Sequence, residues 1–133
     1  MRERAARRAV EAQVPIEVVD ARAEQLPFPD HSFDAAAITL LLCSVHNIER
    51  SLTELRLVLR PGAPVLLVEH MRAPQAPMAA MQKALTPLQR RLTGNCHLAR
   101  QTVDALRAAG FTIGNCRPHL GGTLLELTAH APS

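Results

Sequence analysis

The stretch AEQLPFPDHSFDAAAITLLLCSV, residues 23–45, joins a proline-punctuated acidic connection to a long apolar run. The run FDAAAITLLL, residues 33–42, is apolar without alternation, which is typical of a strand buried on both faces in a parallel sheet. The connection before it contains Leu26-Pro27, and proline fixes the backbone at little entropic cost. The stretch therefore predicts a doubly buried strand that is entered from a rigid apolar loop.

Further strands are predicted on either side of this stretch. They are IEVVD (16–20), APVLLVEH (63–70), FTIGNCR (111–117) and GTLLELTAH (122–130). APVLLVEH again reads as doubly buried. The connection between the last two runs is so short that we expect an antiparallel hairpin, because a parallel crossover needs about a dozen residues or more.

Helices are predicted between these strands. Residues 2–13 are rich in helix formers, Asn47 can cap a helix that carries an apolar stripe, and Pro61-Gly62 ends that helix. Residues 78–92 form a further helix that Pro87 kinks or splits, and residues 99–109 form one that Gly110 caps. The resulting order α-β-β-α-β-α-α-β-β predicts an α/β fold with a three-layer, mostly parallel sheet.

Composition predicts a single globular domain of 133 residues. Hydrophobic residues make up 47% and charged residues 20%, and ten prolines with abundant Ala and Arg are typical of a GC-rich bacterial gene. Aromatic residues are limited to three Phe, which argues against base stacking and nucleic-acid binding. The net charge of +3 is concentrated in an arginine-rich start, which we interpret as a solvated helix face rather than a phosphate grip.

The cysteines and the hydropathy indicate a compartment. Cys43, Cys96 and Cys116 are odd in number and contain no C-x-x-C, which fits a reducing environment and gives no metal framework. No apolar run reaches the roughly 18 residues that a membrane helix needs, and the basic start lacks an apolar signal core. We therefore expect a cytoplasmic protein with no stable membrane insertion and no metal site.

Motifs in one order carry a family resemblance. A-E-Q-L-P-F-P-D-H-S-F-D, E-L-R-L-V-L-R-P-G-A and V-L-L-V-E-H resemble the class I S-adenosylmethionine-dependent methyltransferases, in particular the ubiquinone/menaquinone type and the thiol methyltransferases. L-L-C-S-V, E-H-M-R-A-P and G-N-C-H-L-A-R-Q-T are similar to the thiol group. The resemblance runs from residue 1 to about residue 111. It implies a Rossmann-like fold, S-adenosylmethionine as cofactor and a small-molecule substrate that is methylated on a thiol or hydroxyl.

The resemblance also implies site residues. Arg22, Ala23 and Glu24 match the loop that cups the adenine, while Thr39 and Leu40 match the strand end that approaches the methionine part of the cofactor. Many relatives have Asp or Asn where this chain has Arg22. A guanidinium only donates hydrogen bonds and cannot accept one from the adenine amino group.

The catalytic group stays unassigned. His70 lies at the predicted carboxyl end of a strand, where ligands bind in open α/β sheets, and it is the one candidate that we name on the substrate side. An ordinary, structurally satisfied histidine is an equal alternative for this position.

A departure from the family pattern concerns its first part. The sequence contains no G-x-G-x-G turn, and about fifteen residues precede the run IEVVD. The resemblance therefore implies an N-terminally truncated chain, the C-terminal two-thirds of a domain, in which the first two strands of the family order 3-2-1-4-5-7-6 are missing. A truncated gene or a start codon set too late would both give this pattern.

The missing strands have predicted consequences. Run 33–42 becomes an edge, and the possible outcomes are direct pairing with 16–20, a homodimer through the open edge, or failure to fold alone. Of these we predict direct pairing. We also expect impaired cofactor binding, and the alternative function is a non-catalytic remnant that binds a partner through its exposed sheet edge.

Overall fold

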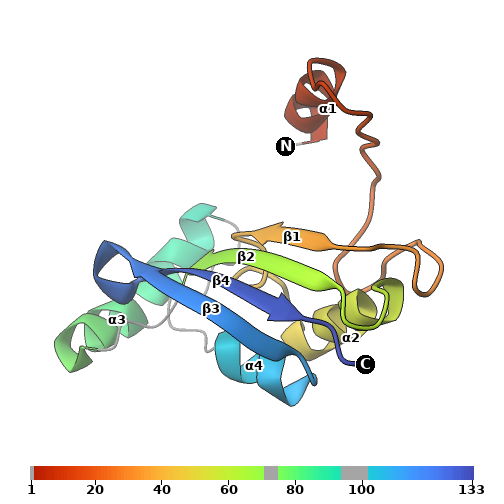
Figure 1. Ribbon diagram of the computed structural model, residues 1–133. Helices are drawn as coiled ribbons and strands as arrows, with labels where there is room; N and C mark the ends of the chain where they lie inside the picture. Colours follow the sequence, from red (N-terminus) through yellow and green to blue (C-terminus); the bar gives the residue numbers. More distant parts are fainter. Residues whose placement is uncertain (1, 71–74, 94–101) are drawn as a thin grey trace.

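The computed structural model of the protein describes residues 2–70, 75–93 and 102–133. Its centre is a four-stranded sheet in the order β1-β2-β4-β3 (Figure 1). The strands are β1 (Ala36–Thr39), β2 (Pro64–His70), β3 (Thr112–His119) and β4 (Leu124–His130). β1 and β2 are parallel, whereas β2–β4 and β3–β4 are antiparallel. The α/β class and the C-terminal hairpin are confirmed, but the sheet is mixed rather than mostly parallel.

The helices begin and end close to where the sequence predicts. They are α1 (Arg2–Val10), α2 (Ile48–Val58), α3 (Ala76–Thr93), which contains Pro87, and α4 (Thr102–Ala108). Asn47 caps α2, because its side chain accepts a hydrogen bond from the Arg50 amide at 2.8 Å. Gly110 follows α4 with a φ of 90°, a conformation that suits glycine at a helix end. Residues 99–101 of the predicted last helix lie outside the described residues.

The hydrophobic core lies on one face of the sheet. β2 alternates, so that Val65 and Leu67 are buried against the core while Leu66 between them is 58% exposed. Leu52 of α2 and Leu106 of α4 complete this core and are fully buried. The prediction that both faces of this strand are buried is therefore wrong for the described residues. An apolar run in the sequence cannot show which of its faces is covered by helices. The first helix, α1, stands apart from the sheet in Figure 1.

The segment 16–20 corrects a second prediction. It is extended but forms no strand, and Ile16 is 53% exposed. Direct pairing with the run 33–42 is therefore wrong. Only 36–39 of that run is a strand, and it forms one edge of the sheet. An extended segment becomes a strand when a neighbouring strand completes a ladder with it, and among the described residues 16–20 belongs to no ladder.

Residues just before β1 run beside the end of α2 instead of continuing the sheet. The amides of His31 and Phe33 donate to the carbonyls of Leu57 and Val58 at 2.9 and 3.0 Å. The Arg60 amide returns a bond to the Phe33 carbonyl at 3.0 Å. These backbone bonds, which we call the 31–60 seam, fix the direction in which the chain enters β1.

Candidate functional site

The connection between β1 and α2, residues 40–47, leaves the carboxyl ends of the parallel strands, where open α/β sheets bind ligands. Leu40 begins it with a φ of 51°, and its amide donates to the Val68 carbonyl at 2.8 Å. Leu40 and Leu41 are each 43% exposed, and Thr39 is also exposed. The connection therefore presents a hydroxyl and two apolar side chains outward.

Glu69 of β2 holds the first part of this connection from inside. Its carboxylate is fully buried and accepts hydrogen bonds from the amides of Leu41 and Leu42, both at 2.8 Å, and from that of Cys43 at 3.1 Å. Hydrogen bonds to a charged acceptor are strong, which allows the charge to be buried. Glu69 was not among the site residues predicted from the sequence. Its position two residues after Leu67 on an alternating strand is the signal that could have revealed an inward-pointing acid.

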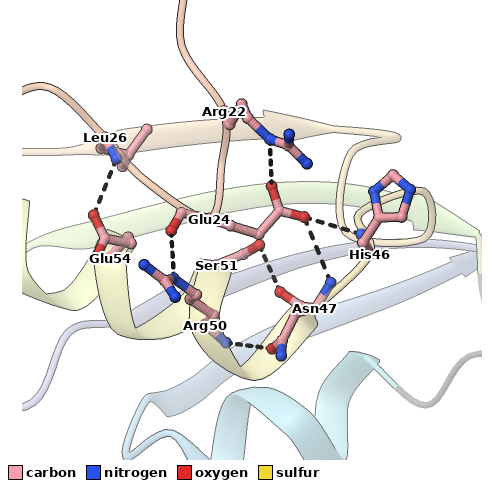
Figure 2. Close-up of polar contacts among 8 residues, drawn as sticks. All are labelled: Arg22, Glu24, Leu26, His46, Asn47, Arg50, Ser51 and Glu54. Carbon is pink, nitrogen blue, oxygen red and sulfur yellow. Dashed lines mark hydrogen bonds and ion pairs between the residues drawn. The ribbon is translucent and has the colours of Figure 1, made fainter.

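Glu24 holds the last part of the connection (Figure 2). Its carboxylate accepts from the amides of His46 at 3.0 Å and Asn47 at 3.5 Å, at the start of α2. The Arg50 Nε donates to the Glu24 carbonyl at 2.9 Å. The turn around Glu24 is thereby fastened to the connection 40–47.

The pKa of the Glu24 carboxyl is lowered. The largest cause is a hydrogen bond from its own backbone amide, followed by the amides of His46 and Asn47 and the charge of Arg22, while burial opposes the change. Arg22 Nε lies 3.9 Å from a Glu24 oxygen. The carboxylate is consequently held in its charged form at neutral pH.

The predicted site residues fall into two adjoining segments. Arg22 has an exposed side chain, whereas Ala23 is partly buried against the core. Glu24 joins this turn to His46 and Asn47, at the far end of the connection that follows Thr39 and Leu40. A ligand site shared by residues 22–24 and 39–40 stays a prediction, and the carboxylate of Glu24 itself is occupied by the amides at the start of α2.

A cavity of about 350 Å³ on the sheet face opposite the core also includes Thr39. It is lined by residues of all four strands, among them Leu66, Val68, Arg117 and Glu126, but not by residues 22–24. His70, the predicted substrate residue, ends β2 opposite Leu124 and is partly buried. A common pocket for all the predicted residues thus stays a prediction.

Two negative findings concern the described part of the chain. Within it, no group of three or more His, Cys, Asp and Glu side chains is placed to hold a metal ion. In the same ranges, no helix has the length and hydropathy to cross a membrane. Cys43 is buried and Cys116 exposed, whereas Cys96 lies outside the described residues.

Comparison with known proteins gives the class. The family model for a methyltransferase domain matches residues 1–67. Thiol S-methyltransferase TMT1B of Rattus norvegicus is 36% identical over 84 residues, which are 62% of this chain and 34% of that protein. The ubiquinone/menaquinone biosynthesis C-methyltransferase UbiE of Bradyrhizobium diazoefficiens is 35% identical over 111 residues, 80% of this chain and 43% of that protein.

Solved structures agree on the fold. An S-adenosylmethionine-dependent methyltransferase from Mesorhizobium loti superposes with a TM-score of 0.73 at 19% identity, over 98% of this chain and 76% of that one. Because the family model covers more than half of the residues, the chain belongs to the methyltransferase domain family, the class I S-adenosylmethionine-dependent methyltransferases. It spans 34% and 43% of the lengths of the two curated relatives named above.

Proposed function

We propose that this chain forms the C-terminal two-thirds of a single methyltransferase domain and that it binds S-adenosylmethionine to methylate a small molecule on a thiol or hydroxyl. The observation that carries the proposal is the connection 40–47, which leaves the carboxyl end of β1 and is fastened by Glu24 to the turn at Arg22 and Ala23. The names of the relatives, a thiol S-methyltransferase and a quinone-pathway C-methyltransferase, support a small acceptor.

The residues present fit part of the cofactor. Thr39 and Leu40 are exposed at the strand end, where they can contact its methionine portion, and Leu26-Pro27 offers an apolar wall for the adenine. Arg22 can donate to a ring nitrogen but cannot accept from the adenine amino group. No glycine-rich turn is present in the sequence to receive the ribose and the methionine part. We therefore propose weak binding by this chain alone.

The cofactor supplies an electrophilic methyl group for displacement by a nucleophile. The protein's contribution to such a reaction is alignment of nucleophile and methyl group, and exclusion of water. Leu40 and Leu41 contribute apolar surface on the ligand side, and Thr39 contributes a hydroxyl. His70 stays the proposed substrate-side residue because it ends the strand next to β1. We assign no general base, and we place the protein in the reducing cytoplasm.

Calorimetric titration with S-adenosylmethionine tests the proposal. Micromolar to submillimolar binding supports it, and the absence of heat at millimolar cofactor contradicts it. Arg22→Asp introduces the missing acceptor and is expected to tighten binding about tenfold, in line with one hydrogen bond to a charged group. Arg56→Asp makes the same charge change at an exposed position of α2 and is the matched control.

A second candidate function is an interaction module that pairs through the open edge, including a homodimer. It is favoured by the position of β1 at the end of the sheet. Among the described residues, β1 pairs with a strand on one side, β2. The Leu40 amide points to β2, so by alternation those of Ala37 and Thr39 point to the open edge. Light scattering of the eluting protein across a concentration series tests this. Ala37→Pro removes an edge donor and should abolish a dimer, whereas Ala12→Pro, which removes the donor of a turn just after α1, should not.

A further inference from the structure

We infer that Glu69 is a positioning residue for the proposed methyltransferase site: its buried carboxylate is an internal anion that fixes the backbone of residues 41–43 and so the outward display of Thr39, Leu40 and Leu41. The inference rests on the proposed function only for the ligand that this display serves. The contact of Glu69 with the connection is independent of any ligand.

The geometry of residues 41–43 supports this role for Glu69. Three consecutive amides, those of Leu41, Leu42 and Cys43, converge on its carboxylate. Successive backbone N–H groups that converge in this way form a concavity of the kind that binds anions. Here the protein fills the concavity with its own side chain. A ligand carboxylate or phosphate therefore finds no open amides at 41–43.

Burial of the Glu69 charge makes its contact with the amides energetically important. Glu69 is 0% exposed, and a charge buried without partners is strongly destabilising. The three amides satisfy this charge, so the conformation of the connection and the burial of the acid depend on each other. The positive φ of Leu40, which a β-branched or bulky residue adopts at a cost, is retained next to this contact.

Two acids, Glu69 and Glu24, hold opposite ends of the connection 40–47. Glu24 accepts from the amides of His46 and Asn47 at the far end of the same connection. Between the two acids, the amides of Ser44 and Val45 donate to the Leu41 carbonyl at 2.8 and 3.1 Å. Both ends of the connection are thus fixed by carboxylates, and its outward surface is left to Leu40 and Leu41. That surface suits an uncharged, apolar part of a ligand.

Amide hydrogen exchange on the intact chain tests the inference. In the unaltered protein, the amides of Leu41, Leu42 and Cys43 should exchange as slowly as those of Val65 and Leu67 in β2. Rates typical of an open loop would overturn the inference without any variant being made.

The variant series separates positioning from general stability. In Glu69→Gln the side-chain oxygen can still accept, but the amide nitrogen then faces the Cys43 N–H as a second donor. Exchange at Cys43 should rise about a hundredfold and at Leu41 and Leu42 about tenfold, relative to the β2 amides. Glu69→Asp keeps the charge and should give a smaller rise.

Glu126→Gln is the matched control, because it makes the same change at an exposed residue opposite Val68 in the same sheet. It should leave exchange at 41–43 unchanged. An equal rise over the whole sheet in Glu69→Gln, with no excess at 41–43, would mark Glu69 as an ordinary core residue and refute the inference.

Titration with S-adenosylmethionine adds the functional arm. If the unaltered chain binds the cofactor, Glu69→Gln should weaken binding about tenfold or more, and unchanged binding would sink the positioning role. If the unaltered chain does not bind, the proposed function fails, while the exchange data still decide whether Glu69 holds the connection.

Discussion

Two segments of similar composition form different structures in this chain. Residues 16–20, IEVVD, and residues 65–69, VLLVE, are both short runs of aliphatic side chains that end in an acid. The second is a strand with partners on both sides, β1 and β4, and Val65 and Leu67 within it are buried. The first is extended without a ladder, and its Ile16 is 53% exposed. Strand propensity is thus realised where neighbours exist to complete it.

The strongest test of this comparison truncates one residue of each segment to alanine, and it has the largest expected effect on the free energy of unfolding. Leu67→Ala removes a side chain that is 1% exposed and should lower the free energy of unfolding by about 2–5 kcal/mol. Val18→Ala should change it by less than about 0.5 kcal/mol, because Val18 is 36% exposed and lies outside the core cluster. Urea unfolding measures both. A cost above 1 kcal/mol for Val18→Ala would show that residues 16–20 are packed in solution.

Asn47→Ala sharpens the comparison on the packed side. The variant loses the cap of α2, a hydrogen bond of 2.8 Å to the Arg50 amide, and should lower the free energy of unfolding by about 1 kcal/mol. Asn115→Ala on exposed β3 is the control and should have a smaller effect. Equal costs for the two variants would mean that the cap contributes nothing specific.

Glu24 links the N-terminal segment to the packed part, and its effect should be the smallest of the three. Its pKa is lowered in the folded protein, so the unfolded chain binds the proton more tightly. The resulting stability is present above the ordinary pKa of about 4.5 and is lost as the pH falls through the lowered folded value. Thermal unfolding from pH 7 to pH 3 should show a shallower acid decline in Glu24→Gln than in the unaltered protein. Parallel declines would indicate that the carboxylate is not held by the amides.

Much of the packed part could be predicted from local patterns. The cap at Asn47, the stop at Pro61-Gly62 and the hairpin of β3 and β4 follow from turn chemistry and connection length, which depend on neighbours in the sequence. The family motifs gave the fold class, because several of them in one order restrict the fold more than any one does alone.

The wrong predictions concern contacts between residues that are far apart in the sequence. Whether the second face of β2 is covered, and whether residues 16–20 find a ladder partner, depend on elements far away in the chain. The role of Glu69 was missed for the same reason, since its three amide donors precede it by 26 to 28 residues. The candidate site residues at 22–24 and 39–40 came from family motifs, and the contacts that fasten Glu24 to His46 and Asn47 came from the structure.

The 31–60 seam has a consequence for the order in which the chain folds. It and the β1–β2 ladder, in which Ala36 pairs with Val65, close loops of about 30 residues, whereas Leu67 pairs with Leu127 sixty residues further on. Doubling a loop adds about 0.6 kcal/mol of closure entropy, so we expect the unit from residue 31 to residue 70 to form before β4, already paired with β3 in a short hairpin, docks on β2. In stopped-flow refolding, Leu52→Ala should then slow folding, while Leu127→Ala should mainly accelerate unfolding, and the reverse assignment would place the nucleus in the C-terminal hairpin.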